Sequence, residues 1–129
     1  MKENKIIFTG PVGVGKTTAI TALSDEPPVQ TDASASDMTL VRKGYTTVAM
    51  DYGVIWLDEE IKVHLYGTPG QERFNFMWEI LSKGSMGLVL LLDNTRTNPL
   101  KDLKFFLDAF QELLKTAPLV VGVTKMDIR

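Results

Sequence analysis

The sequence predicts a single α/β domain whose central sheet is mostly parallel. Short apolar runs of strand length alternate along the chain with stretches of helical periodicity, which is the order that gives parallel strands linked by helices. The chain has 129 residues, of which 44% are hydrophobic and 23% charged, and these values are ordinary for one globular domain. We therefore interpret residues 1–129 as one domain.

The first half of the chain is expected to hold three strands and one helix. An apolar run at 6–9 predicts a buried strand, and the apolar spacing within 16–23 predicts a helix. Periodicity is lost from residue 24 to about 45, where two prolines and small polar residues indicate a long loop. Strands are expected again at 47–57 and 61–66, and their hairpin adds one antiparallel edge to the sheet.

The second half alternates between helix and strand. A helix is expected at 74–82, a strand buried on both faces at 86–92, and a last apolar strand at 119–123. Before that last strand, Asn98 and Pro99 are the residue types that begin a helix. Apolar residues at helical spacing follow them and predict one long helix: Leu100, Leu103, Leu107, Phe110 and Leu114.

The composition excludes several classes of protein. A formal net charge of -2 argues against a nucleic-acid-binding protein, because such proteins usually carry a basic face. The absence of cysteine excludes disulfides, thiolate metal sites and prenylation. The first residues lack the apolar core of a signal peptide, and no apolar run approaches the ~20 residues that span a bilayer. We therefore expect a cytoplasmic protein without an intrinsic membrane segment.

The stretch GPVGVGKTT, residues 10–18, fits the pattern G-x-x-x-x-G-K-[ST] between a strand and a helix. Glycines let successive backbone N–H groups turn toward phosphate oxygens, and the N-terminus of the helix directs its partial positive charge at the same anion. We expect Lys16 to contact the β- and γ-phosphates and the Thr17 hydroxyl to bind Mg²⁺. The candidate nucleotide-binding residues of this motif are Gly10, Pro11, Val12, Gly13, Val14, Gly15, Lys16, Thr17 and Thr18. The motif alone separates neither ATP from GTP nor a hydrolase from a kinase.

Two further motifs resemble those of the Ras-like small GTPases. GTPGQERF, residues 67–74, follows a predicted strand. In that family the matching glycine N–H meets the γ-phosphate and the glutamine orients the attacking water, and these roles fall to Gly70 and Gln71. TKMD, residues 124–127, ends a predicted strand and resembles the family's motif for reading guanine. The resemblance therefore assigns recognition of the base to Thr124, Lys125 and Asp127.

The stretch TTVAMDYG, residues 46–53, resembles the first switch of the same family. By this resemblance Thr47 binds Mg²⁺ and joins Lys16 and Gln71 among the catalytic candidates, while the adjacent Thr46 leaves the register open. Arg42 lies shortly before this stretch and is a candidate for reaching the transition-state charge in cis. A solvated loop charge is the alternative interpretation of Arg42.

Two departures from the family pattern set further expectations. Gly67 stands where most of the family has an aspartate that holds Mg²⁺, and Asp51 is a candidate to replace that carboxylate. Together with the TPGQ sequence, this loss resembles the bacterial small GTPases of the MglA type. The family's domain continues past the base motif with a helix, an edge strand and a final helix. We therefore expect that the C-terminal part of the domain is missing from this chain.

The resemblance implies a P-loop NTPase of the small G-domain type that binds GTP or GDP with Mg²⁺ and hydrolyses GTP slowly. Loops at about 25–47 and 67–83 would order around the γ-phosphate and give a molecular switch. Its expected partners are regulators and effectors, among them a Roadblock-type activating protein. Phe74, Phe76, Met77 and Trp78 are either core residues or a partner-binding patch. The alternative functions are a nucleotide-gated scaffold with negligible hydrolysis and a small P-loop kinase.

Overall fold

The computed structural model describes residues 4–11, 13–27, 29–30, 51–68 and 75–128. Several predicted site residues lie outside these ranges, namely Val12, Arg42, Thr46, Thr47, Gly70 and Gln71. Phe74 and most of the two predicted switch loops lie outside them as well.

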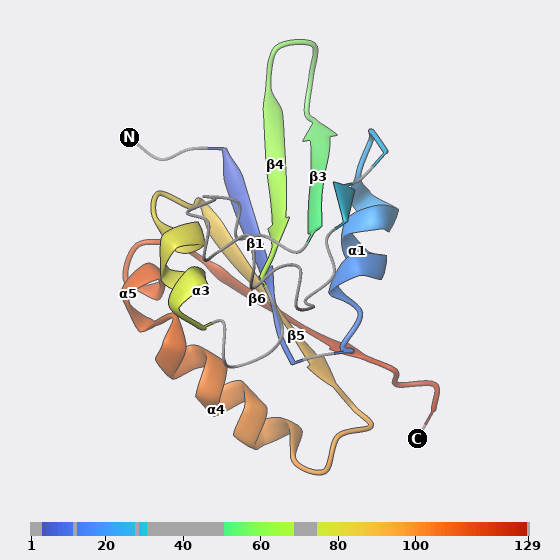
Figure 1. The fold of residues 1–129 in the computed structure, drawn as a ribbon, viewed down its shortest axis with the longest axis vertical. Helices are drawn as coiled ribbons and strands as arrows, with labels where there is room; N and C mark the ends of the chain where they lie inside the picture. The colour runs from blue at the N-terminus through green and yellow to red at the C-terminus, as the bar shows by residue number, and fades with distance from the viewer. Residues whose placement is uncertain (1–3, 12, 28, 31–50, 69–74, 129) are drawn as a thin grey trace, which may run out of the picture.

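Ten elements follow one another in the described part of the chain (Figure 1). The strands are β1 (Lys5–Thr9), β2 (Val29–Gln30), β3 (Asp51–Trp56), β4 (Lys62–Gly67), β5 (Gly87–Asp93) and β6 (Leu119–Thr124). The helices are α1 (Lys16–Leu23), α3 (Asn75–Ser82), α4 (Pro99–Ala109) and α5 (Gln111–Leu114). Helix α1 has the predicted bounds, and the described ends of the predicted strands agree to within one residue.

The described strands form one mixed sheet in the order β2-β3-β4-β1-β5-β6. Strands β4, β1, β5 and β6 run parallel to one another, whereas β3 is antiparallel to both β4 and β2. The β3–β4 hairpin projects beyond the rest of the sheet in Figure 1. This arrangement confirms the predicted α/β fold with a mostly parallel sheet and an antiparallel hairpin.

Strand β2 corrects the prediction of an unbroken loop from residue 24 to 45. Val29 pairs with Tyr52 and Gln30 with Asp51, so this segment adds a short strand beside β3. A strand of two residues has no alternation that a pattern could detect, and the prolines before it favour a loop. The pairing is fixed by the neighbouring strand rather than by the local sequence.

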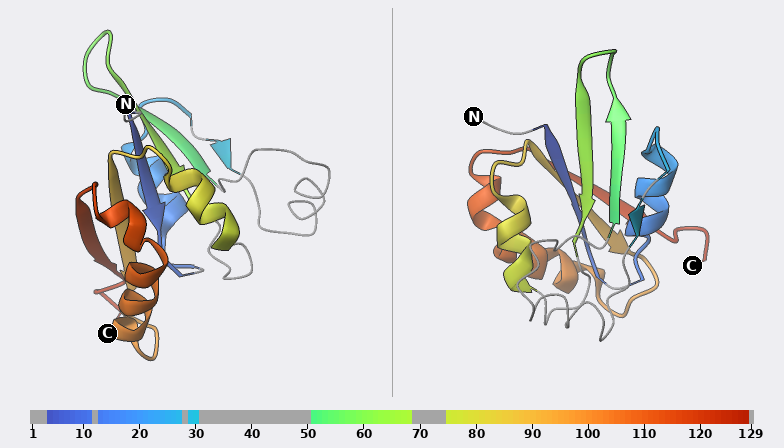
Figure 2. Two further views of the ribbon diagram at one scale, coloured as in Figure 1. Left: turned by 90° about the vertical axis from the view of Figure 1, so that its left-hand side faces the viewer. Right: turned by 45° about the horizontal axis from the view of Figure 1, so that its top comes forward.

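Alternation along the strands divides the helices between the two faces of the sheet (Figure 2). On one face, Phe8 of β1 and Leu65 of β4 pack with Ile20 of α1. On the other face, Ile7 of β1 and Leu88 of β5 pack with residues of α3 and α4. Because successive strand residues point to opposite faces, the central strands are buried on both sides, as their apolar runs predicted.

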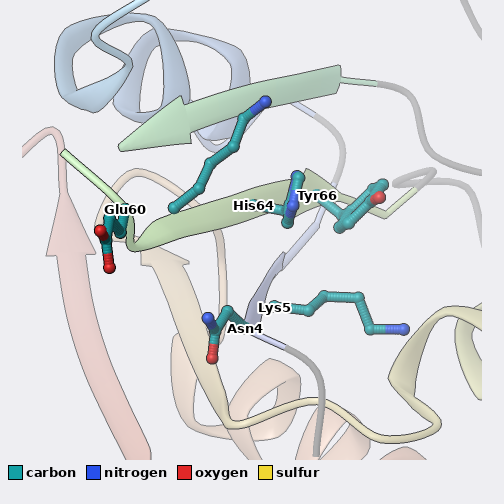
Figure 3. Close-up of a pocket in the computed structure, with 6 residues that line it drawn as sticks. Asn4, Lys5, Glu60, His64 and Tyr66 are labelled. Atoms are coloured by element: carbon teal, nitrogen blue, oxygen red, sulfur yellow. The ribbon is translucent and has the colours of Figure 1, made fainter. Parts of the chain in front are cut away.

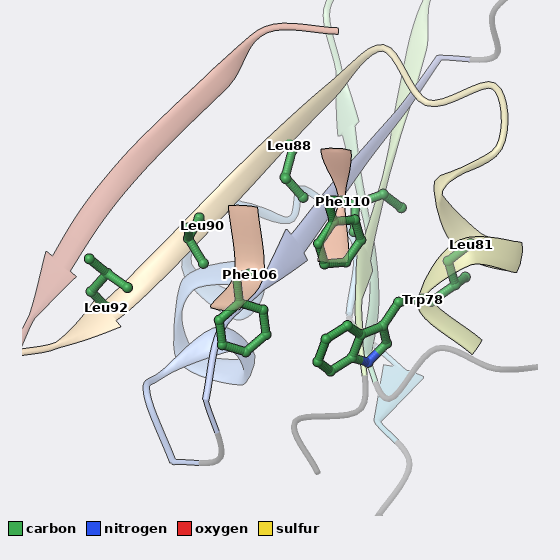
Figure 4. Packing of buried hydrophobic residues seen from close by; sticks show 8 residues of the cluster. Trp78, Leu81, Leu88, Leu90, Leu92, Phe106 and Phe110 are labelled. Carbon is green, nitrogen blue, oxygen red and sulfur yellow. The ribbon is translucent and has the colours of Figure 1, made fainter. Parts of the chain in front are cut away.

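Trp78 of α3 belongs to the larger core cluster and lies beside Phe106 and Phe110 (Figure 4). Its side chain is 2% exposed, and its ring stacks on Phe106 and Phe110 with centroids 5.1 and 5.6 Å away. Stacked aromatic pairs add to the free energy gained by burial. Of the two interpretations offered for the aromatic residues at 74–78, the structure assigns Trp78 to the core.

The single long helix predicted after Pro99 is wrong in two respects. The chain turns at Phe110, between α4 and α5, where φ is -108° and ψ is 18°. Phe110 itself is buried, so the helical spacing survives across a break that the sequence pattern does not reveal. Leu100 is 73% exposed and makes no part of the core. The start is as predicted, because the Asn98 side chain accepts a hydrogen bond from the backbone N–H of Lys101 at 3.2 Å.

Across the described residues, every helix is too short or too polar to cross a membrane.

Candidate functional site

The loop between β1 and α1 follows a backbone path that favours glycine. Gly10, Gly13 and Gly15 have φ angles of 150°, 78° and 112°, in a region that residues with a Cβ rarely adopt. At Gly10 a Cβ would also collide with the carbonyl oxygen of Leu91 in β5. Glycine at residue 10 therefore allows the start of the loop to pack directly against the backbone of β5.

Helix α1 begins directly after this loop and has no side chain at its N-terminal cap. The capping residue is Gly15, and the first turn contains no acidic residue. The first N–H groups of a helix have no partner within the helix and carry a partial positive charge. This end of α1 is therefore suited to an anion, as predicted for a phosphate-binding loop.

Lys16 is buried inside the loop rather than extended into solvent. Its side chain is 8% exposed, and Nζ donates to the carbonyl oxygens of Gly10 at 2.9 Å and Pro11 at 3.1 Å. Burial lowers the pKa of Lys16 to about 8, and the nearby Asp51 carboxylate acts in the opposite direction. The structure thus holds a cation at the point where the loop and α1 meet.

The next residue, Thr17, is joined to Asp51 at the start of β3. The Thr17 hydroxyl lies 3.0 Å from each carboxylate oxygen of Asp51 and donates to that group. Asp51 is 5% exposed, and burial raises the pKa of its carboxyl group, while the hydrogen bond from Thr17 and the charge of Lys16 lower that pKa. A hydroxyl, a carboxylate and an ammonium group are therefore gathered in one place.

Asp51 reaches this place because its cross-strand partner is Gly67. The antiparallel register of β3 and β4 sets these two residues opposite each other. A Cβ added to Gly67 would lie 3.0 Å from Oδ2 of Asp51 and 3.1 Å from Cδ1 of Ile20. The absence of a side chain at residue 67 thus leaves room for the carboxylate of the facing strand.

This donor set fits a magnesium ion held partly by a ligand. Mg²⁺ takes oxygen ligands and is usually bound by one or two carboxylates together with phosphates and waters. Thr17 and Asp51 supply such oxygens from the chain. Among the described residues, no group of three or more His, Asp or Glu side chains gathers around a point, which is the pattern expected of a metal site built from protein alone.

The predicted base-reading motif TKMD begins at Thr124, the last residue of β6. The Thr124 hydroxyl donates to the carbonyl oxygen of Val14 at 2.8 Å and approaches that of Leu92 at 3.3 Å. Val14 belongs to the glycine-rich loop, so this hydroxyl joins two motifs that are 110 residues apart in sequence. The predicted base-reading segment is thereby fixed to the predicted phosphate-binding segment.

Lys125 has a constrained position after this strand. Its φ angle is 61°, the one positive value found for a residue other than glycine in the described part of the chain. Its Nζ forms an ion pair with Oδ2 of Asp93 at 2.9 Å. Asp127 is exposed two residues later. The sequence does not single out Asp93, and its one signal is a carboxylate that directly follows an apolar strand.

The described candidate residues of both motifs gather at one edge of the sheet. Strands β1, β5 and β6 are parallel, so their carboxyl ends lie at the same edge, which is where α/β proteins bind ligands. The residues placed there from the predicted set are Gly10, Pro11, Gly13, Val14, Gly15, Lys16, Thr17, Thr18, Thr124, Lys125 and Asp127. Gly67 and Asp51 join them from the hairpin.

A separate shallow hollow of about 490 Å³ lies at the opposite end of β1 (Figure 3). Its lining includes Asn4 and Lys5, which stand at the amino end of β1, and His64 and Tyr66 of β4. The amino edge of a parallel sheet is remote from the loop that follows β1. We therefore do not assign the hollow to the site described above.

Comparison with known proteins agrees with this geometry. Residues 8–129 match the family described as "conserved hypothetical ATP binding protein". The chain is 36% identical over 94 residues to an uncharacterized protein of Methanocaldococcus jannaschii, an alignment that covers 73% of this chain and 53% of that protein.

Two further relatives are a Ras-related protein and an intraflagellar transport protein. The chain is 28% identical over 111 residues to the Ras-related protein Rab-8A of Gallus gallus, covering 84% of this chain and 48% of the relative. It is 27% identical over 108 residues to intraflagellar transport protein 22 of Chlamydomonas reinhardtii, covering 84% and 53%. The chain thus spans about half the length of the curated relatives that it matches.

Proposed function

The chain belongs to the family described as conserved hypothetical ATP binding proteins, and from this premise we propose that it binds GTP with Mg²⁺ and hydrolyses it to GDP. At a coarser level, the family and the Rab relatives support a nucleotide-binding protein of the small-GTPase kind. The observation that carries the proposal is the gathering of Lys16, Thr17 and Asp51 at the glycine-rich loop.

The loop would hold the phosphates through backbone and side chain together. No side-chain cap occupies the N–H groups at the start of α1, so they would be available to the phosphate oxygens. Lys16 adds a full positive charge beside them. Because Lys16 Nζ is anchored on Gly10 and Pro11, its ammonium group stays near the loop when no phosphate is bound. Phosphoryl transfer depends mainly on such positioning and charge stabilisation.

Thr17 and Asp51 would hold the metal ion. Most Ras-like small GTPases use an aspartate at the position of Gly67 for this role, and Asp51 would take its place. When bound, Mg²⁺ neutralises charge on the phosphate oxygens. The support for this assignment is the paired geometry of the hairpin: the carboxylate stands on β3, and the space for it exists because β4 has Gly67.

The metal assignment is tested by the effect of Mg²⁺ on the release of a fluorescent GDP analogue. In Asp51→Asn, the Mg²⁺ concentration that half-maximally slows release should rise about 10–100-fold, as for other groups that support a metal site. In the double variant Asp51→Gly with Gly67→Asp, the carboxylate is moved to the facing strand and the response to Mg²⁺ should recover. An Asp51→Asn protein with the wild-type response would exclude Asp51 from the metal site.

A matched control is Asp58→Asn in the hairpin turn. The Asp58 carboxylate also accepts hydrogen bonds, from the backbone N–H groups of Glu60 and Ile61 at 2.7 and 2.8 Å, but it stands at the far end of the hairpin from Asp51. Its response to Mg²⁺ should equal that of the wild type, which separates metal binding from general stability of the hairpin.

Guanine is proposed as the base because Asp127 ends the TKMD segment at the carboxyl edge of the sheet. A carboxylate accepts hydrogen bonds from the ring N–H and amine of guanine, whereas adenine would leave it without such donors. The family's description mentions ATP and the Rab relatives are GTPase-related. Competition between GDP and ADP for the same site decides between guanine and adenine, and a preference for ADP would overturn the guanine assignment.

Hydrolysis is proposed with Gln71 orienting the water, and with Gly70, Thr47 and Arg42 as further candidates around the γ-phosphate. Single-turnover hydrolysis by the wild type and by Gln71→Leu tests this. A wild-type rate well above that of Gln71→Leu supports a GTPase. If both proteins hydrolyse GTP at equal and negligible rates, the protein is a nucleotide-gated scaffold. Glycine instead of aspartate at residue 67 favours that alternative.

We also propose that the loops at about 25–47 and 67–83 change conformation with the nucleotide and bind regulators, as in the MglA type with its Roadblock-type activating protein. Limited proteolysis in GDP and in a non-hydrolysable GTP analogue tests the switch. Cleavage within these loops should slow in the GTP analogue, and identical cleavage in both nucleotides would contradict a switch.

A further inference from the structure

We propose that Asp93 is a positioning residue for base recognition, which fixes Lys125 and through it the segment that carries Asp127. The proposal rests on the function proposed above and adds to it a residue that the three motifs do not include. It is carried by two separate observations, the buried contacts of the Asp93 carboxylate and the strained backbone of Lys125.

The first observation is that both oxygens of Asp93 are used, and each for a different purpose. Oδ1 accepts from the backbone N–H of Thr95 at 2.8 Å and from its hydroxyl at 2.5 Å, which forms the turn after β5. Oδ2 accepts from Nζ of Lys125 at 2.9 Å. The side chain of Asp93 is 5% exposed, against 35% for Lys125. A buried, fixed anion therefore holds a lysine that is still partly open to solvent.

The charge of Asp93 is secure at neutral pH. The hydrogen bond from the Thr95 hydroxyl is the main cause that lowers the pKa of Asp93 to about 2, and the contact with Lys125 adds to it, while burial opposes both. Since the carboxylate stays ionised, the attraction to the ammonium group persists over the whole physiological range.

The second observation is the left-handed backbone at Lys125, with φ of 61°. This conformation is unfavourable for a residue with a Cβ, and such strain persists only where the surroundings enforce it. Here the N–H of Asn94 donates to the carbonyl oxygen of Thr124 at 3.1 Å, and the N–H of Ile128 to that of Lys125 at 3.2 Å. The ion pair with Asp93 adds the side-chain anchor.

These contacts determine where the lysine stem lies. Lys125 is attached at one end to the tip of β6 and at the other end to the tip of β5, since Asp93 and Thr124 are register partners on those strands. Its aliphatic stem is therefore stretched between two neighbouring strand ends. A stem held in this way offers a fixed apolar surface to one face of a purine ring without paying side-chain entropy on binding.

The variant Asp93→Asn tests the proposal because asparagine keeps an oxygen for the turn at Thr95 but loses the charge that holds Lys125. The affinity for GDP should fall about tenfold, the size expected when a hydrogen bond to a charged group is lost. The affinity for inorganic tripolyphosphate, which has no base, should stay at the wild-type value. A protein that had merely lost stability would lose both affinities together.

A matched control is Asp102→Asn. Asp102 pairs with Arg96 of the same β5–α4 connection, with atoms 2.5 and 3.1 Å apart, but it does not contact Lys125. The affinity of the Asp102→Asn protein for GDP should equal that of the wild type. A loss as large as that of Asp93→Asn would mean that the connection as a whole, and not the contact with Lys125, supports binding, and this would overturn the proposal.

A double-mutant cycle shows whether Asp93 acts through Lys125. If it does, Asp93→Asn should cost little in a Lys125→Met background, so that the two losses do not multiply. Losses that multiply, or wild-type GDP affinity in Asp93→Asn, would overturn the positioning role while leaving the proposed function intact. Failure of the wild type to bind GDP at all would overturn both.

Discussion

The two ends of the candidate site are built in different ways. The phosphate end, residues 10, 11 and 13–17 with Asp51, consists of tight backbone and buried polar groups: Lys16 is 8% exposed and Asp51 5%. The base end, residues 124–127 with Asp93, is held by the Lys125–Asp93 ion pair, the Thr124 hydroxyl and two backbone hydrogen bonds, and its Met126 is 61% exposed. The phosphate end is therefore largely preformed, whereas the base end relies on a few anchors.

The position of each end in the sheet explains this difference. The phosphate end follows β1, which has a parallel neighbour on both sides, and it is covered by α1. The base end follows β6, which is the last strand of the described sheet. Val120 and Val123 of β6 are 61% and 48% exposed. Neighbours on both sides fix the loop after β1, whereas among the described strands β6 has a neighbour on one side.

The strongest way to break the phosphate end is Gly10→Ala. Alanine would need a φ of 150° and would collide with the carbonyl oxygen of Leu91, so we expect a loss of about 3 kcal/mol or more in the free energy of unfolding. Phosphate affinity should be lost as well. Thermal unfolding and the binding of tripolyphosphate measure the two effects.

Two other glycines separate strain from function. Gly13 and Gly84 have φ angles of 78° and 74°, and a Cβ on either would meet no atom within 4 Å. Alanine at either position should therefore cost a similar, smaller amount of stability, about 1–2 kcal/mol. Only Gly13→Ala should also weaken the binding of phosphate. Equal binding by both variants would contradict a preformed phosphate end.

The residues proposed for the phosphate end can be picked out from the sequence because they lie close together in the chain. The glycines, Lys16 and Thr17 lie within one short motif, and the strand and helix around it are set by apolar periodicity. The base end is also marked by a short motif, TKMD. The motifs give no role to Asp93, and the sequence offers Asp51 only as a candidate for the carboxylate that Gly67 lacks. The contacts of both carboxylates, with Gly67 and with Lys125, are made across neighbouring strands or strand ends.

The positions of these two carboxylates depend on strand register, which no single stretch contains. Asp51 lies within an apolar run, where an isolated acidic residue gives no sign that a glycine stands opposite. The same reason accounts for β2, whose two residues are defined by their pairing with β3. Local chemistry is readable from the sequence, and contacts between strands require the fold.

Binding at the phosphate end should depend on pH, because Lys16 there has a lowered pKa. The pKa of Lys16 is about 8 in the folded protein and 10.5 ordinarily. Bound phosphate raises the pKa of an adjacent lysine, so binding takes up a proton above pH 8. The affinity for GDP should fall by up to tenfold per pH unit between about pH 8 and 9.

Lys16→Arg is the control for this pH dependence, because its guanidinium remains charged and any residual slope belongs to the nucleotide. If the affinity for GDP falls equally with pH in the wild type and in Lys16→Arg, titration of Lys16 does not cause the pH dependence. The free energy of unfolding without nucleotide should change with pH in the opposite direction to the affinity for GDP. Between pH 8 and 10.5 the unfolded chain holds this proton more tightly, so the contribution of Lys16 increasingly favours the folded state as the pH rises.

The smallest expected effect concerns the one described hydrogen bond that joins the two ends, from the Thr124 hydroxyl to Val14. Thr124→Val keeps the shape of the side chain and removes that bond, which should cost about 1 kcal/mol. Because the bond sets the base end against the loop, GDP should bind about fivefold more weakly, while tripolyphosphate binds as before. Isothermal titration of both ligands measures this.

Thr116→Val is the matched control, because the Thr116 hydroxyl also donates to a backbone carbonyl, that of Leu113 at 3.4 Å, but in the turn after α5. It should leave both affinities unchanged. If Thr124→Val instead weakened tripolyphosphate as much as GDP, the loop would depend on β6 for its shape. The phosphate end would then not be preformed by its own backbone, and the contrast between the two ends would fail at the bond that connects them.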